Sequence, residues 1–327
     1  MSRKARLDAP GALHHVMVRG LNRSAIFEDD QDRSRFVERL GQNIIETQSS
    51  LYAWVVMETH AHLLVRSGKA GVSSLMRKLL TWYAQYYNRR HNRTGHLFEN
   101  RYKSILCEEE KYLLALVRYI HLNPIRAKIV KTIEELDRYP WSGHRMMMGK
   151  EECRWMDRGY LLAQFGSTKR KALRAYWHFV QEGLGEGHRP DLGGGGLIRS
   201  QGGWSQVLAL RSRGEKESFD DRILGSGDFV EQVLREAEGR QLRQMRYRRR
   251  GRSIEDIIQE ECEEGKVSEQ EVRQGSRRRR VSKVRAAIAQ RSKEELGVSG
   301  AEIARHLGVN TSSINRALVK GDQLTRQ

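Results

Sequence analysis

Two histidines separated by one residue, His60 and His62, are the residues of this sequence best placed to do chemistry. They lie between two apolar segments, 53–57 and 63–65, which predict strands. Side chains two positions apart on a strand point to the same face, so both imidazoles can bind one metal ion while Ala61 points the other way. Taken alone, such a pair is more often structural than metal-binding, so other residues must decide between the two interpretations.

A predicted helix over residues 108–122 carries a second pair of reactive groups. Tyr119 and Asn123 are four residues apart and lie on one helical face, just before Pro124 stops the helix. Two imidazoles and a carboxamide would form a mixed nitrogen and oxygen site for a divalent cation, Mg²⁺ or Mn²⁺. A tyrosine hydroxyl near such a metal can attack phosphorus and keep a cut DNA strand attached as an ester.

Each member of this set has a competitor. Four other tyrosines are rival nucleophiles on composition alone: Tyr83, Tyr86, Tyr87 and Tyr112. Asn123 precedes a proline, which is also a common way to end a helix. Glu58 is a rival metal ligand, because strand alternation puts it on the same face as His60 and His62.

The overall charge points to a polyanionic partner. Lys and Arg total 59 against 41 Asp and Glu, a net charge of +18 in 327 residues. This balance favours nucleic acid, with an anionic membrane surface as the other candidate. No segment approaches the ~20 apolar residues of a membrane span, and no apolar signal core follows the basic N-terminus. We therefore expect a cytoplasmic, nucleoid-associated protein.

The three cysteines are too few and too far apart for a disulfide framework or a zinc signature. They are Cys107, Cys153 and Cys262. Any bound metal must therefore rely on histidine and oxygen ligands.

The elements that must position these residues alternate between strand and helix. Strands are predicted at 13–19, 52–56 and 63–65, helices at 30–45, 73–90 and 108–122, and an extended basic segment at 96–106. Ser73 or Ser74 is the expected cap of the second helix. This order predicts an α+β fold: a ferredoxin-like catalytic domain over residues 1–145, with an antiparallel sheet and helices on one face. A helical extension at 146–190 is expected to pack onto it.

The second half of the chain predicts a separate all-α domain. A Gly-rich linker region is expected at 191–228, where the four glycines 193–196 favour a flexible linker over a phosphate cradle because no P-loop lysine follows. A helical DNA-binding domain then covers 229–327. Within it, residues 299–319 fit a helix-turn-helix with Gly308 at the turn. The expected core is Ile303, Leu307, Val309, Ile314 and Leu318. A plain αα-hairpin is the alternative.

Two groups of residues are expected to contact DNA. The second helix of the helix-turn-helix would present Thr311, Ser312, Ser313, Asn315 and Arg316 to a duplex. In the catalytic domain, the cations expected at phosphates are Arg19, Arg23, Arg89, Arg90, Arg93, Arg101 and Lys103. An ordinary packed surface is the competing interpretation of the second group.

Four segments, in this order and spacing, resemble the IS200-like, single-tyrosine HUH transposases and especially the REP-associated tyrosine transposases: 14–20, 53–64, 93–103 and 119–127. The resemblance implies a divalent metal bound by His60, His62 and Asn123, with Tyr119 as nucleophile. It also implies cleavage of single-stranded DNA near hairpins, a 5′-phosphotyrosine, a free 3′-OH and rejoining of strands. The C-terminal helices, with the basic segment 277–285, resemble more loosely the DNA-binding domain of bacterial replication initiators.

The sequence leaves two other functions open. One is a catalytically silent, sequence-specific DNA-binding regulator, and the other is a nuclease that uses metal-bound water. If strand exchange requires two tyrosines, one Tyr119 per chain favours a homodimer.

Overall fold

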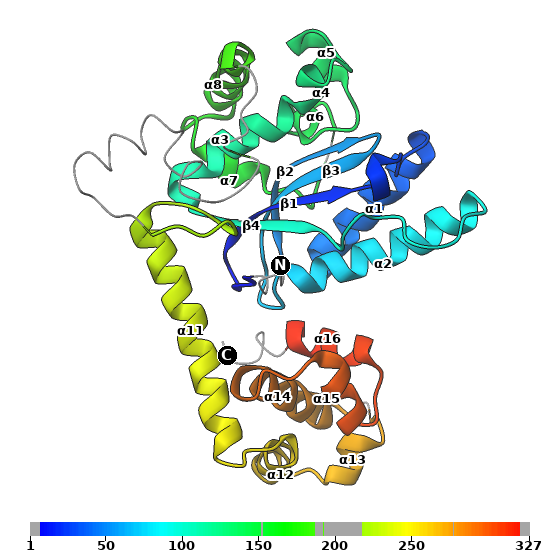
Figure 1. Cartoon of the computed structure of the whole chain (residues 1–327), viewed down its shortest axis with the longest axis vertical. Coiled ribbons are helices and arrows are strands. Elements are labelled where there is room, and N and C mark those ends of the chain that lie inside the picture. The colour runs from blue at the N-terminus through cyan, green and yellow to red at the C-terminus, as the bar shows by residue number, and fades with distance from the viewer. Residues whose placement is uncertain (1–6, 152, 187–191, 193–217, 277, 321–327) are drawn as a thin grey trace. The chain divides into compact units, whose positions relative to one another are not determined.

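A five-stranded sheet in the order β2-β3-β1-β4-β5 organises the N-terminal part of the chain (Figure 1). The computed structural model describes residues 7–151, 153–186, 192, 218–276 and 278–320, and the chain divides into two units, 1–231 and 232–327. Strands β1 (Leu13–Arg19), β2 (Ser50–Met57), β3 (His60–Arg66) and β4 (Lys103–Cys107) pair antiparallel, and β5 (Ile223–Leu224) joins β4 in parallel. The sheet is therefore mixed only at the β5 edge.

The two crossover helices give the sheet its ferredoxin-like topology. Helix α1 (Asp30–Glu46) connects β1 to β2, and α2 (Val72–Arg90) connects β3 to β4, which is the split βαβ order. Phe36 of α1 and Tyr83 of α2 meet edge to face, with ring centroids 5.1 Å apart, and both contact Phe27. The predicted α+β class and ferredoxin-like arrangement are confirmed.

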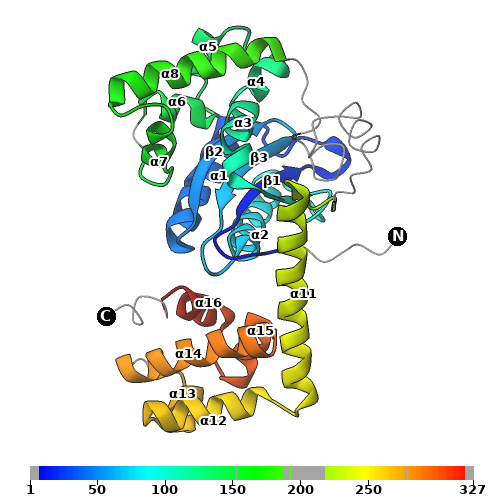
Figure 2. The ribbon, with the colours of Figure 1, turned by 90° about the vertical axis from the view of Figure 1, so that its left-hand side faces the viewer.

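Helix α3 (Glu109–His121) covers the opposite face of the sheet, against β2 and β3 (Figures 1 and 2). The expectation of helices on one face holds for α1 and α2 but omits α3. With both faces covered, β2 has no polar face, and all its residues from Leu51 to Met57 are buried. The position of α3 matters because it brings Tyr119 to the sheet face that carries the histidine pair.

Strands β2 and β3 form a hairpin whose turn is Glu58 and Thr59. The turn is held from outside, since the backbone N–H groups of Ile26 and Phe27 both donate to the Glu58 carbonyl, at 2.9 and 3.1 Å. The backbone N–H of Gly20 donates to the Thr59 carbonyl at 2.9 Å. The histidine pair therefore opens β3 rather than lying in the middle of one continuous strand region.

Two local expectations are corrected by contacts distant in sequence. Helix α2 begins after Gly71, and neither Ser73 nor Ser74 caps it; the Asp8 carboxylate accepts from the backbone N–H of Val72 at 2.8 Å and of Ser73 at 3.1 Å. A carboxylate at a helix N-terminus satisfies donors that the helix itself leaves unpaired. The segment 96–106 is extended only from Lys103 onward.

Further helices complete the first unit. They are η1 (Leu21–Arg23), α4 (Asn123–Arg126), α5 (Ile133–Arg138), α6 (Gly143–Met147), α7 (Arg158–Ala163), α8 (Lys169–Glu182) and η2 (Gly183–Glu186). Among them, α4 and α6 contact β2, and α4 and α8 contact α3. Leu161 and Tyr176 are fully buried in the same core as the sheet, which confirms that the predicted helical extension packs onto it. Residues 193–196, the predicted linker glycines, lie outside the described residues.

The second unit is helical. Helix α11 (Gly227–Arg249) begins in the first unit and continues through most of residues 240–252, a segment rich in arginine. It is followed by α12 (Ile254–Gly265), α13 (Glu269–Arg273), α14 (Arg279–Glu295), α15 (Gly300–His306) and α16 (Thr311–Lys320).

The predicted helix-turn-helix corresponds to α15 and α16. Ile303, Leu307 and Ile314 are fully buried in its core, with Val309 and Leu318 packed against them. Gly308 has φ +60°, and a Cβ there would lie 2.6 Å from the Arg273 carbonyl oxygen, so the turn requires glycine.

Candidate active site

Strand β3 places His60 and His62 on one face of the sheet. His60 lies opposite Arg19 and His62 opposite Met17 in the pairing with β1. The two imidazole rings are edge to face, with centroids 5.3 Å apart. The intervening Ala61 is fully buried and points to the other face. The structure therefore brings the two side chains together as strand alternation predicts.

Both imidazoles are held neutral at neutral pH. Burial lowers the pKa of His60 to about 4, and the positive charge of Arg19 lowers it further. Burial lowers the pKa of His62 well below its usual range, with smaller contributions from the neighbouring His15 and His60. A neutral imidazole keeps a lone pair on one ring nitrogen, which is what metal coordination requires.

His15 of β1, which the sequence analysis did not select, joins this cluster. Its Nε2 atom lies 3.0 Å from Nδ1 of His62, and the two rings stack with centroids 5.2 Å apart. Its Nδ1 atom lies 3.1 Å from the carbonyl oxygen of Leu192. Strand alternation puts His15 on the same face as Met17 and Arg19, but only the pairing of β1 with β3 shows that this face carries His62.

Helix α3 brings Tyr119 to the two histidines. Leu116 and Ile120 are fully buried against the sheet, and Tyr119, next to Ile120, lies half-buried at the edge of that contact. Its ring centroid is 6.1 Å from that of His62 and 5.9 Å from that of His15, both edge to face. The cluster therefore combines a phenol with neutral imidazoles.

Arg126 and Asn123 surround the backbone of Tyr119. The guanidinium carbon of Arg126 lies 5.3 Å from the Tyr119 ring centroid, and its Nη1 donates to the Tyr119 carbonyl at 3.1 Å. The Asn123 amide nitrogen donates to the carbonyls of Tyr119 at 3.1 Å and Ile120 at 3.3 Å. Asn123 opens α4, so it follows the helix break as the competing interpretation expected, while its carboxamide oxygen stays available as a ligand.

The donors fit a divalent metal. Nδ1 of His62 is engaged by His15 and Nδ1 of His60 by the Thr59 hydroxyl at 3.0 Å, which leaves Nε2 of each ring for coordination. Within the described residues, no group of three His, Cys, Asp or Glu side chains could hold a metal by itself. Coordination would therefore need an amide oxygen, for which Asn123 is the candidate, or oxygen atoms of the substrate.

The rival residues lie elsewhere. Tyr83, Tyr86 and Tyr87 belong to α2, on the opposite face of the sheet. The Tyr83 hydroxyl donates to the Ile26 carbonyl at 2.6 Å and the Tyr87 hydroxyl to the Glu28 carboxylate at 2.7 Å. Tyr112 is buried in the first turn of α3, and Glu58 is exposed in the hairpin turn rather than on the strand face.

Residues 10–123 match the family model described as "Transposase IS200 like". The match includes His15, His60, His62, Tyr119 and Asn123. Residues 10–123 are therefore similar to IS200-like transposases. The family is one of DNA transposases, and the basic composition of this chain agrees with that likeness.

The remaining comparisons add little to this likeness. No curated protein matches the sequence significantly. A solved structure of a REP-associated tyrosine transposase bound to a REP hairpin aligns with 46% of this chain and 87% of its own, at 20% identity and a TM-score of 0.36. The likeness to IS200-like transposases rests on the family match. Among the described residues, no helix is long and apolar enough to cross a membrane.

The cations predicted to contact DNA in the transposase domain differ in their surroundings. Five are exposed: Arg19, Arg23, Arg89, Arg101 and Lys103. Arg90 is instead held by Asp29 and the fully buried Asp32, each at 2.5 Å, and it keeps the pKa of Asp29 well below its usual range. We therefore assign Arg90 a structural role. Arg93 lies over the Tyr87 ring, 5.6 Å from its centroid.

In the second unit, α16 carries the residues predicted to contact a duplex. Ser312 and Arg316 are exposed, and Thr311 and Ser313 are half-buried. The Asn310 carboxamide oxygen accepts from the backbone N–H of Ser313 at 2.7 Å and caps this helix. The side chain of Asn315 lies outside the described parts of the chain.

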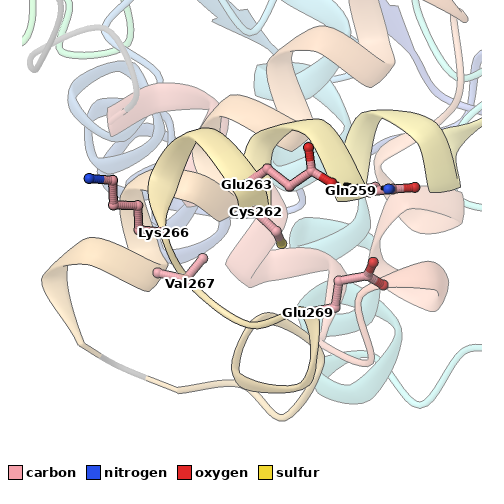
Figure 3. A pocket seen from close by; sticks show the side chains of 6 residues that line it. All are labelled: Gln259, Cys262, Glu263, Lys266, Val267 and Glu269. Atoms are coloured by element: carbon pink, nitrogen blue, oxygen red, sulfur yellow. Dashed lines mark hydrogen bonds between the residues drawn. The ribbon is translucent and has the colours of Figure 1, made fainter.

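A shallow pocket of about 390 Å³ lies where α12 ends and α13 begins (Figure 3). It is lined by Gln259, Cys262, Glu263, Lys266, Val267 and Glu269. Gln259 and Glu263 hydrogen-bond to each other at 3.0 Å. The lining has neither the imidazoles nor the phenol of the transposase domain, so we assign the chemistry to the sheet.

Proposed function

We propose that the chain is a metal-dependent transposase that cuts and rejoins single-stranded DNA through a 5′-phosphotyrosine at Tyr119. The observation that supports it best is the contact of the Tyr119 ring with the neutral His62, which in turn contacts the neutral His60. A phenol beside a pair of unprotonated imidazoles is the set of groups that phosphodiester transfer to tyrosine needs.

The residues divide the chemistry between them. The Tyr119 oxygen attacks phosphorus and forms a phosphotyrosine ester, while the bond from phosphorus to the 3′-oxygen breaks. The phenol gives up its proton and the departing 3′-oxygen gains one. Arg19, which pairs with His60 across the strands, and Arg126, which lies over the Tyr119 ring, supply positive charge to the site. A divalent metal bound by His60, His62 and Asn123 would polarise the phosphate and stabilise the leaving oxygen.

Rejoining follows from the same geometry. Cleavage exchanges one phosphate ester for another, so the phosphotyrosine retains the bond energy of the DNA backbone. A free 3′-OH can then attack the phosphotyrosine, release the Tyr119 phenol and reform a DNA strand. No external energy source is required for this reversal.

The target we propose is a hairpin formed by REP-type repeats. Support comes from the four motif segments of the transposase domain, whose order and spacing resemble the REP-associated proteins. We also propose that the second unit binds duplex DNA through α16, since this second helix of the helix-turn-helix carries the exposed Ser312 and Arg316. The protein would then act at the nucleoid in the cytoplasm.

The experiment incubates the full chain with an end-labelled, hairpin-flanked single strand and Mg²⁺ or Mn²⁺. We expect a DNA–protein adduct that survives denaturing electrophoresis, and its loss in Tyr119→Phe. Tyr86→Phe, on the opposite sheet face, is the matched control and should still form the adduct. An adduct that persists in Tyr119→Phe would remove Tyr119 as the nucleophile.

Two other outcomes separate the alternative functions. Cleavage without any adduct would indicate a hydrolytic nuclease. Specific binding with neither cleavage nor adduct, under both metals, would indicate a DNA-binding regulator. Exchange between two labelled ends would in addition require two copies of Tyr119, which predicts a homodimer on DNA, measurable by analytical ultracentrifugation.

A further inference from the structure

We infer that His15 is a positioning residue that fixes the tautomer and the ring orientation of His62, so that Nε2 of His62 presents its lone pair to the metal. The inference rests on the proposed function for the identity of the ligand. It concerns a residue on a different strand, and it follows from the direction of two hydrogen bonds.

The chain of hydrogen bonds starts at Leu192. A backbone carbonyl oxygen can only accept a hydrogen bond. Since Nδ1 of His15 lies 3.1 Å from the Leu192 carbonyl oxygen, Nδ1 must carry the proton and donate it. The Leu192 residue is itself buried, with 2% of its surface exposed, so this acceptor is part of the core around the sheet.

The proton on Nδ1 of His15 also decides which atom donates in the hydrogen bond between His15 and His62. A neutral imidazole carries one N–H, so the Nε2 atom of His15 is an acceptor. It lies 3.0 Å from Nδ1 of His62, and His62 must therefore donate from Nδ1. The remaining ring nitrogen of His62, Nε2, keeps its lone pair. This is the tautomer that a metal ligand bound through Nε2 requires.

The surroundings keep both rings in the neutral form that this direction assumes. His15 is completely buried and His62 nearly so, and burial favours the uncharged form of an imidazole. The charges that act on the two rings from neighbouring strands are positive, those of Lys103 on His15 and of Arg19 on His62. Among the described residues, no carboxylate is hydrogen-bonded to either ring.

The other imidazole of the pair lacks such a constraint. Nδ1 of His60 lies 3.0 Å from the Thr59 hydroxyl, which can donate or accept. Either tautomer of His60 satisfies this contact. Only His62 is held in one tautomer, and the group that holds it reaches the site from residue 192, far beyond the tyrosine helix.

The first measurement is made on the metal-free wild-type chain. Two-bond ¹H–¹⁵N NMR correlations of the histidine rings report which nitrogen carries the proton. We expect His62 and His15 both protonated at Nδ1. A His62 protonated at Nε2 in this protein would overturn the inference without the need for any variant.

The second measurement is Mn²⁺ affinity by calorimetry, which requires no DNA. His15→Leu removes both hydrogen bonds at similar volume, and we expect about 10- to 100-fold weaker binding, the usual effect of losing a partner that orients a metal ligand. His15→Gln can donate to Leu192 and accept from His62, so it should retain most of the affinity. His14→Leu is the matched control, since His14 is equally buried on the opposite face, where it contacts Ser104.

The outcomes distinguish this inference from the proposed function. Unchanged Mn²⁺ affinity in a folded His15→Leu would contradict the inference. It would also be contradicted if His15→Gln lost as much Mn²⁺ affinity as His15→Leu and Mn²⁺ acted directly on the His15 ring of the wild type, because His15 would then be a ligand. If the wild-type chain binds Mn²⁺ through His62 but never forms the Tyr119 adduct, the proposed function fails and the role of His15 stands. Should His15→Leu fail to fold, the wild-type tautomer and His15→Gln still decide.

Discussion

Two networks of buried histidines flank the tyrosine helix, and they end on different groups. The first runs from the Leu192 carbonyl through His15 to His62. The second runs from the Asp137 carboxylate through His144 and Tyr176 to His121. In the second, the Tyr176 hydroxyl lies 2.8 Å from Nδ1 of both histidines, and Nε2 of His144 lies 2.7 Å from Asp137. The first network ends at the uncharged ring of His62, and the second ends at the Asp137 carboxylate.

The difference separates ligand binding from scaffolding. A backbone carbonyl fixes an imidazole without adding charge, so the lone pair of His62 stays available. A carboxylate anchors its partner strongly, and here it joins four helices: α5 with Asp137, α6 with His144, α8 with Tyr176 and α3 with His121. The second network therefore holds the helix that carries Tyr119, while the first prepares the group beside it.

The largest expected effect comes from removing one histidine from each network, His62 from the first and His144 from the second. His62→Ala should lower DNA cleavage roughly 100-fold or more, because a metal ligand stabilises the transition state by several kcal/mol. Its unfolding free energy should fall less than that of His144→Ala, since His62 is 8% exposed and His144 is completely buried. His144→Ala should lower the unfolding free energy and leave Mn²⁺ affinity intact. Calorimetry measures the Mn²⁺ affinity of both variants, and urea denaturation measures their unfolding free energy. Equal losses of affinity and of stability in the two variants would contradict the prediction.

Tyr176→Phe breaks the second network at its centre. It removes one hydroxyl and leaves Nδ1 of both His121 and His144 without a partner in a fully buried site. We expect about 1–3 kcal/mol lower unfolding free energy, the usual cost of unpaired buried polar groups. Urea denaturation measures it. Tyr83→Phe, which removes a single buried hydroxyl bonded to one carbonyl, is the control and should cost less.

The buried histidines His15 and His60 should make the stability of the protein depend on pH. The folded-state pKa values of His15 and His60 are lowered to about 4, below the ordinary unfolded value of 6.5, so the unfolded chain binds more protons between these limits. Stability of the metal-free protein is therefore present above pH 6.5 and is lost as the pH falls toward 4. His15→Gln should reduce the slope by about 1 kcal/mol per pH unit. Denaturation at several pH values measures the slope, and an unchanged slope would contradict the neutral state of His15.

The smallest effect is expected at His60, whose hydrogen-bond partner does not fix its tautomer. Thr59→Ala removes the hydroxyl that Nδ1 of His60 contacts, at a half-exposed position where water can replace it. Mn²⁺ affinity should fall by less than about fivefold, equivalent to roughly 0.5–1 kcal/mol. A loss as large as that of His15→Leu would show that both histidines need the same degree of control.

Local patterns in the sequence predicted the parts of the site that depend on one element. Strand alternation predicted the shared face of His60 and His62, and helical spacing predicted that Asn123 lies near Tyr119, although Asn123 opens the next helix. These inferences need only the geometry of a single strand or helix. The helix-turn-helix core was predicted for the same reason, because Ile303, Leu307 and Ile314 follow helical periodicity.

Parts of the site that depend on distant segments were not predictable. His15 became visible only through the pairing of β1 with β3 and a carbonyl 177 residues away. The engagement of Arg90 by Asp29 and Asp32 likewise depends on how α1 and α2 pack. Composition marked Arg90 as a DNA contact, but an ion pair with a buried carboxylate removes it from that role. Non-local pairing, rather than residue type, decided both cases.

The hairpin turn at Glu58 and Thr59 also limits how this chain can change in length. Because side chains alternate along β3, a one-residue shift of this strand against β1 and β2 would turn both histidines toward the packed face of α1 and α2. Insertions and deletions at this turn should therefore preserve the site only where the loop alone changes length and the pairing of β3 stays as it is. A random length-variant library can test this rule.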